Sequence, residues 1–188
     1  MSVLLVVLLA ILSRVLPVAL HQQAWNFSLL GGSLLFMGSR LASDSPRRAA
    51  LKIGGVLAGL AITDYGLTVY GYGFPFHING FLLTWAWYVG VIVASMGLFR
   101  KVSAVRVAAG AVATPTSFFL LSNFVVWVGG GMYAHSISGL AQCYAMGLPF
   151  YRNDLVSTGL ATVALFGLPA IATRIAESFR PADHNIPA

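Results

Sequence analysis

The chain has little acid and almost no cysteine, and both shortages restrict what it can be. Only five of its 188 residues are Asp or Glu, and charged residues of both signs make up 9%, against about 25% in soluble domains. The single cysteine, Cys143, excludes an internal disulfide. With a mean hydropathy of +0.83, the composition indicates a membrane protein. The basic pI is therefore attributed to membrane topology, and no nucleic-acid partner is expected.

Motifs that carry chemistry are equally scarce. Neither His-x-x-x-His nor Cys-x-x-Cys spacing occurs around His77, His135 or Cys143, so no metal or haem is expected. There are no paired carboxylates, no phosphate loop and no Gly-x-Ser-x-Gly elbow. Cys143 is eight residues from His135, a spacing that does not place a base against the thiol on one helix. We therefore expect no cofactor and no enzymatic activity.

Long apolar runs, by contrast, occupy most of the chain. Each is about long enough to cross a hydrocarbon core of roughly 30 Å at 1.5 Å per residue, and they cover residues 2–19, 25–42, 51–72, 78–99, 107–128 and 155–172. The first run lacks a preceding positive segment and a small-residue cleavage site, so we interpret it as a retained helix rather than a secretory signal. The sequence thus predicts an all-α membrane protein with six transmembrane helices in a single domain over residues 1–188.

The positive charges are distributed unevenly around these runs. Two basic residues, Arg14 and Arg152, fall on one side of the predicted membrane, and nine fall on the other: Arg40, Arg47, Arg48, Lys52, Arg100, Lys101, Arg106, Arg174 and Arg180. Short connections rich in Lys and Arg resist translocation. We therefore expect both termini to be cytoplasmic.

The connection from Gly129 to Asp154 is the only substantial one. Its apolar residues recur at helical spacing, and Gly147 and Pro149 are expected to end the helix. We predict a short amphipathic helix between the fifth and sixth transmembrane helices. It would lie in the outer interface or fold back as a lid.

A short repeat marks two re-entry points from the outer side. Residues 75–79 and 149–153 both read Pro-Phe-aromatic-x-Asn. Asn79 and Asn153 would then be either helix N-caps or parts of a polar rim around an outer cavity. Elsewhere, glycines four apart, Gly55 and Gly59, are expected to allow close helix packing.

Two charges lie inside apolar runs. Arg14 is twelve residues after Ser2 and Asp64 thirteen after Leu51, which places both roughly 18–20 Å deep. An isolated charge at that depth is costly, so we predict an Arg14–Asp64 ion pair. Either the pair is structural or one of its members contacts a polar ligand. Asp64 is expected to be the only carboxylate within the core.

Other polar and aromatic residues gather in the same outer half. The polar residues are Asn26, His77, Asn79, Ser122, Asn123, His135, Gln142 and Arg152. The aromatic residues are Trp25, Trp85, Trp87, Tyr88, Trp127, Tyr133, Tyr144 and Tyr151. Such aromatics form either an interfacial belt or a stacking pocket.

Several motifs also carry a family resemblance. They comprise Arg14, Asp64, Ser122-Asn123-Phe124 with Trp127, Gly130-Gly131-Met132-Tyr133, Gly139, Cys143-Tyr144 and Pro149-Phe150-Tyr151-Arg152-Asn153. With them the chain resembles an uncharacterised family of bacterial six-helix membrane proteins over nearly its whole length. More distantly, it is similar to the S-components of energy-coupling-factor vitamin transporters.

The resemblance implies an S-component-like bundle in the bacterial cytoplasmic (inner) membrane, with an externally facing pocket. It also implies ATPase and coupling subunits as partners. The paired alanines that many S-components use on the first helix are not matched, because Ala10 is followed four residues later by Arg14.

Two hypotheses follow. In the first, the chain binds and takes up a small polar or heterocyclic solute, vitamin-like in character, from an outward-facing pocket. The candidate ligand-binding residues are Arg14, Asp64, Asn123, Trp127, Tyr133, His135, Arg152 and Asn153. In the second, the chain is a non-transporting scaffold or assembly subunit in which the polar cluster only holds the bundle together.

Overall fold

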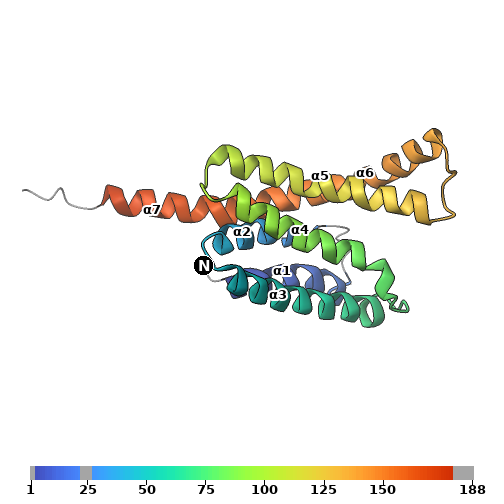
Figure 1. Ribbon diagram of the computed structural model, residues 1–188, viewed down its shortest axis with the longest axis horizontal. Coiled ribbons are helices and arrows are strands. Elements are labelled where there is room, and N and C mark those ends of the chain that lie inside the picture. Colours follow the sequence, from blue (N-terminus) through green and yellow to red (C-terminus); the bar gives the residue numbers. More distant parts are fainter. Residues whose placement is uncertain (1–2, 22–26, 180–188) are drawn as a thin grey trace, which may run out of the picture.

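The computed structural model describes residues 3–21 and 27–179, and all regular secondary structure within them is helical (Figure 1). Trp25, Asn26 and Arg180 lie outside the described residues. The elements are α1 (Val3–Ala19), α2 (Leu30–Leu41), α3 (Pro46–Gly66), the π-helical segment η1 (Leu67–Gly71), the 3₁₀ turn η2 (Ile78–Gly80), α4 (Leu82–Leu98), α5 (Ala104–Gly129), α6 (Ile137–Thr162), a second π-helical segment η3 (Val163–Gly167) and α7 (Leu168–Ser178).

Within the described residues, four helical stretches are long and apolar enough to cross a membrane. They are Pro46–Gly71, Ile78–Leu98, Ala104–Gly129 and Ile137–Ala176. These helices indicate a membrane protein, and they correspond to the third, fourth, fifth and sixth predicted runs. The first two runs form shorter helices, since α1 has 17 residues and α2 has 12.

Helix α2 lies in the middle of the bundle. It contacts α1, α4, α5 and α6, and Leu34, Met37 and Leu41 are at most 2% exposed. Glycines allow neighbours to approach closely: a Cβ at Gly38 would stand 2.6 Å from the carbonyl oxygen of Ile92. The main hydrophobic core therefore includes much of α2.

The close packing predicted around Gly55 and Gly59 does not occur within the chain. Nothing lies within 4 Å of a Cβ built at Gly55, and one at Gly59 would meet only Ile11, at 3.9 Å. The small residues that bring helices together are instead on α2, where the sequence shows a less regular pattern.

The prediction of a separate amphipathic helix before the last span is wrong. Helix α6 begins at Ile137, after Ser136 accepts a hydrogen bond from the amide of Gly139 at 3.2 Å. It then continues through Gly147 and Pro149, and helical structure runs on through η3 and α7 to Ser178. Gly147 serves packing rather than termination, because a Cβ there would lie 2.6 Å from Oδ1 of Asn123 on α5. Pro149 is exposed on the surface of α6.

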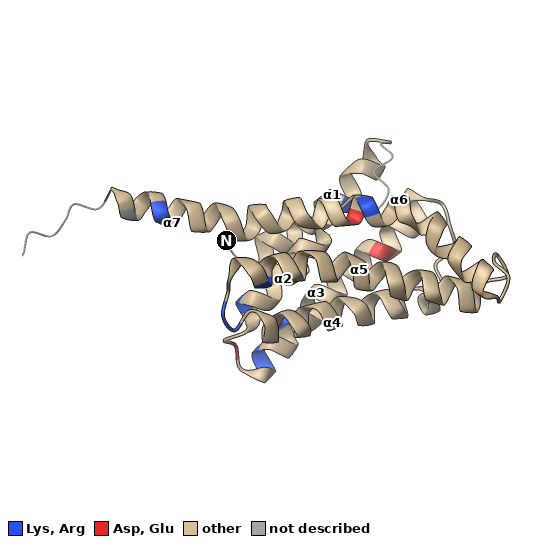
Figure 2. Ribbon diagram, turned by 90° about the horizontal axis from the view of Figure 1, so that it is seen from above, with Lys and Arg blue, Asp and Glu red and all other residues tan. Residues whose placement is uncertain are grey.

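The basic connections share one end of the bundle (Figure 2). This end, called here the basic end, contains the start of α1 and the α2–α3 and α4–α5 connections, and α7 extends beyond it (Figure 1). Arg106 donates to the carbonyl oxygens of Leu98 (3.0 Å) and Lys101 (3.4 Å), so it caps the end of α4. The opposite end, called the far end, contains the α1–α2, α3–α4 and α5–α6 connections.

Candidate functional site

A cavity of about 740 Å³ lies between the helices and reaches the far end. Residues from α1 to α6 line it: Ser13, Arg14, Pro17, Val18, His21, Phe27, Ser28, Leu30, Gly31, Asp64, Leu67, Thr68, Gly71, Tyr72, Phe81, Thr84, Trp87, Tyr88, Phe118, Phe150 and Asp154. Because the lining includes charged groups inside an apolar bundle, this cavity is the candidate functional site.

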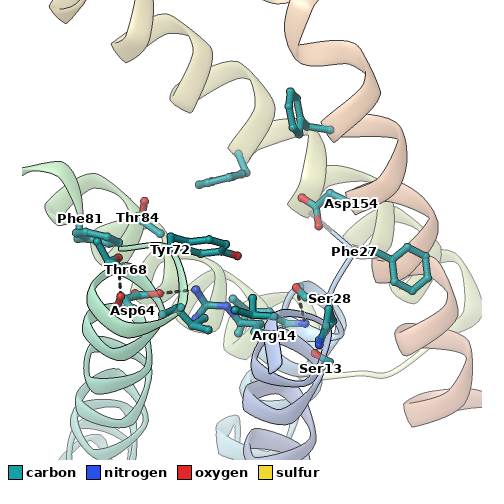
Figure 3. A pocket seen from close by; sticks show the side chains of 18 of the residues that line it. Ser13, Arg14, Phe27, Ser28, Asp64, Thr68, Tyr72, Phe81, Thr84 and Asp154 are labelled. Carbon is teal, nitrogen blue, oxygen red and sulfur yellow. Dashed lines mark hydrogen bonds and ion pairs between the residues drawn. The ribbon is translucent and has the colours of Figure 1, made fainter. Parts of the chain in front are cut away.

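The predicted ion pair forms one wall of the cavity (Figure 3). Nη2 of Arg14 pairs with Oδ1 of Asp64, and the indole Nε1 of Trp85 donates to Oδ2 of Asp64 at 2.8 Å. The Asp64 side chain is 2% exposed and the Arg14 side chain 19%. Both oxygens of the carboxylate are therefore satisfied. Nη1 of Arg14, in contrast, is buried without a hydrogen-bond partner among the described residues.

The local backbone explains how Asp64 and Tyr72 reach the cavity. Helix α3 ends at Gly66, two residues after Asp64, and passes into η1, and the hydroxyl of Thr68 donates to the Asp64 carbonyl oxygen at 2.7 Å. Gly71 lets this segment approach α1, because a Cβ there would lie 2.9 Å from Cγ1 of Val18. Single π-helical turns of this kind occur frequently at functional sites.

A second carboxylate, Asp154, enters the cavity from α6 on the side opposite Asp64 (Figure 3). The hydroxyl of Thr158 donates to its Oδ1 at 3.3 Å. The expectation that Asp64 is the only carboxylate in the core is therefore wrong. Asp154 immediately precedes the predicted run 155–172, and only the extension of α6 toward its N-terminus brings this residue inside the bundle.

The beginning of α2 forms the floor of the cavity. The backbone amide of Leu29 donates to Oγ of Ser13 at 3.0 Å, and Ser13 in turn donates to the carbonyl oxygen of Ala10 at 2.7 Å. Leu30 and Gly31, the first residues of α2, line the cavity. The positive end of the helix dipole therefore faces this space.

Aromatic rings supply much of the remaining wall. Trp87 and Tyr88 line the cavity, as the stacking-pocket interpretation requires, and Trp87 Nε1 donates to Oγ of Ser117 at 3.0 Å. Tyr88 is 4% exposed and lines the cavity together with Arg14, Asp64 and Asp154. The three charged side chains therefore share the cavity wall with one buried phenol.

Four candidate residues lie farther along the α5–α6 hairpin and do not line the cavity: Asn123, Trp127, Tyr133 and His135. Nε1 of Trp127 donates to the carbonyl oxygen of Ala134 at 2.9 Å, and its ring lies 5.7 Å from that of His135. Asn123 lines a smaller space of about 150 Å³ that shares Phe118, Phe150 and Asp154 with the larger one.

The last two candidates, Arg152 and Asn153, are also absent from the wall of the large cavity. Arg152 is exposed on α6. Asn153 lies well inside α6, so it is not an N-cap; Asn79 likewise lies within η2 and caps neither η2 nor α4 with its side chain. Within residues 3–21 and 27–179, no three His, Cys, Asp or Glu side chains are grouped as a metal site requires.

Comparison with known proteins gives one match. A family model described as "Family of unknown function (DUF6580)" covers residues 1–180. No curated protein and no solved structure matches the chain.

Proposed function

The chain belongs to this family of unknown function, and we propose that it is a membrane-embedded binding protein that takes up a small polar solute. The observation that carries the proposal is the 740 Å³ cavity with Arg14 in its wall, one of whose guanidinium nitrogens is buried without a partner in the described part of the chain. Sites for small molecules are mostly about 300–1,000 Å³ in volume and combine apolar walls with a few polar groups. This cavity has that size and that mixture of groups.

The cost of buried charge supports the same proposal. Charged side chains within a membrane normally pair or line a polar cavity, and they commonly mark the path of a solute or ion. Asp64 is fully paired, whereas Arg14 has a buried Nη1 without a hydrogen-bond partner among the described residues and lines the cavity together with Asp154. A solute would supply the missing partners.

We further propose six membrane crossings with the basic end in the cytoplasm. In this arrangement α1 and α2 form the first hairpin, with α2 shielded from lipid, and the cavity opens outward at the far end. The bundle would then act as an S-component-like subunit in a bacterial inner membrane, with a vitamin-like solute. ATPase and coupling subunits would approach the basic end, where α7 extends from the bundle.

A scaffold without transport remains the second candidate because of the bonding around Asp64. Its two carboxylate oxygens connect α3 to Arg14 on α1 and to Trp85 on α4. Such a node would hold three helices together even if no solute bound. The two candidate functions differ in the expected effect of solutes: a solute should stabilise a binding protein only while the cavity is open, and it should not stabilise a scaffold.

The test fills the cavity with Thr84→Trp. Thr84 lines the cavity from α4, whereas Leu82 on the same helix is 53% exposed and outside it, so Leu82→Trp is the matched control. The purified proteins are heated in detergent with a panel of vitamins and their precursors. A solute at 100 times its Kd stabilises a protein by about 2.7 kcal/mol, which raises the Tm of a chain of this size by roughly 5–11 °C.

We expect at least one solute to stabilise the wild type and Leu82→Trp but not Thr84→Trp. Stabilisation of all three proteins would show that the solute binds elsewhere. If no solute stabilises the wild type, the scaffold replaces the binding function.

A further inference from the structure

The charges in the cavity wall do not balance. Arg14 and Asp64 neutralise each other, so Asp154 contributes one uncompensated negative charge when it is ionised and His21 is neutral. Oδ1 of Asp154 accepts one hydrogen bond from Thr158, at 3.3 Å. Its Oδ2 has no hydrogen-bond partner within the described part of the chain. The wall is therefore built to receive a positive group.

Arg14 adds a second requirement. Its Nη1 is buried and has no hydrogen-bond partner among the described residues, and a buried unsatisfied donor costs about 1–3 kcal/mol or more when it is charged. An acceptor oxygen on the solute would remove this cost. The neighbouring N-terminus of α2, which lines the floor through Leu30 and Gly31, also favours an acceptor at that position.

The aromatic walls fit a cation as well. Trp87, Phe118 and Phe150 line the cavity together with Asp154, and aromatic faces attract organic cations by about 0.5–2 kcal/mol. A simple anion is disfavoured, since it would meet two carboxylates and a single guanidinium that is already paired.

We propose that the solute is an organic cation that also carries a hydrogen-bond acceptor. Its charged nitrogen binds the carboxylate of Asp154, and its acceptor oxygen binds the guanidinium of Arg14, whose side chain is 19% exposed in the cavity wall. This inference rests on the proposed solute-binding function and specifies the chemistry of the ligand.

Four compounds on one aromatic skeleton provide the test. 4-(Aminomethyl)benzamide has both the cation and the acceptor, 4-methylbenzylamine has only the cation, 4-methylbenzamide has only the acceptor, and 4-methylbenzoate is an anion. Their Kd values are measured by calorimetry with the full-length protein in detergent at pH 7.5. We expect the first compound to bind best, with the loss of either group weakening binding roughly tenfold or more.

Variants of Asp154 test whether its carboxylate binds the amine of the ligand. Asp154→Asn should remove the advantage of the amine, whereas Asp154→Glu, which retains the charge, should preserve part of it. The matched control is Asp44→Asn, because Asp44 pairs with Lys52 at 2.7 Å outside the cavity; this variant should bind all four compounds as the wild type does.

Each outcome is decisive. Equal or tighter binding of the neutral or anionic compound overturns the inference, and so does an amine preference that survives in Asp154→Asn. If a neutral or anionic vitamin stabilises the protein while neither amine binds, the inference fails and the solute-binding function stands. If neither the four compounds nor the vitamin panel has any effect, both fail.

Discussion

Replacing Arg14 alone by leucine should destabilise the protein more than replacing Arg14 and Asp64 together. In the single variant Oδ1 of Asp64 loses its partner while the side chain stays 2% exposed, and only the Trp85 indole still donates to the carboxylate. Removing one member of a buried ion pair costs about 3–5 kcal/mol. In a chain of this size, that lowers the Tm by roughly 6–20 °C.

The double variant should be damaged less because no charge is stranded. Asp64→Leu alone leaves Arg14 unpaired, but this side chain is 19% exposed at the cavity wall and can turn toward the open space; we expect a loss of about 2–3 kcal/mol. With both residues changed, the main remaining defect is the unpaired Trp85 indole, at about 1 kcal/mol.

The assay is thermal or denaturant unfolding of the four purified proteins in the same detergent. Lys52→Ala serves as the control, because Lys52 is 52% exposed and a surface pair contributes at most about 1 kcal/mol. Additive losses in the Arg14→Leu/Asp64→Leu variant would refute the reasoning. If that variant folds and still binds solute with wild-type affinity, the role of Arg14 in the site is refuted instead.

Three further predictions test topology and packing. In intact cells carrying the Cys143→Ala background, an impermeant maleimide should label Met132→Cys at the far end but not Ser45→Cys at the basic end; the reverse pattern would invert the orientation. Native Cys143, which is 1% exposed, should react with maleimide only after denaturation, as mass spectrometry would show; rapid labelling of the folded protein would contradict its burial. Gly38→Ala should lose about 1–3 kcal/mol of stability because its Cβ would lie 2.6 Å from a carbonyl oxygen of α4. Gly54→Ala, with nothing within 4 Å, should gain up to about 1 kcal/mol; equal effects in unfolding experiments would show that α2 is not tightly enclosed.

The helical class and four of the six apolar runs were predictable because the length and composition of a span reflect the thickness of a bilayer. The same criteria predicted a span over residues 25–42, within which the structure shows the shorter helix α2. A buried helix and a lipid-facing helix are both apolar, so hydropathy alone does not reveal that α2 has 12 residues. The burial of α2 becomes visible only in the structure, where α1, α4, α5 and α6 contact it.

Pro149 and Gly147 misled the prediction for a different reason. Both are strong signals for the end of a helix in water, but here the helix continues through them. Because Gly147 has no side chain, it can pack tightly against Asn123 on α5. The local sequence does not reveal this contact, since Asn123 is far from Gly147 along the chain.

Within the candidate site, the sequence was sufficient for Arg14 and Asp64 because a charge inside an apolar run needs a partner. The sequence did not identify Asp154 as a cavity residue, because Asp154 is the last residue of the predicted 129–154 connection. Trp127 and His135 shared the far end with the cavity without contributing to its wall. Position along the bundle axis was therefore predictable, whereas position around that axis was not.

Helix α6, η3 and α7 form one uninterrupted helical run that connects the two ends of the protein. The apolar span of 40 residues within it, Ile137–Ala176, corresponds to a rod of about 60 Å, twice the thickness of a hydrocarbon core. Asp154 in the cavity and the projecting α7 belong to this one rod, with no loop between them. If the whole helix pivots by about 10° about η3, Ser178 moves by roughly 3 Å. A displacement of α6 at the cavity is then transmitted to α7 at the opposite end of the protein.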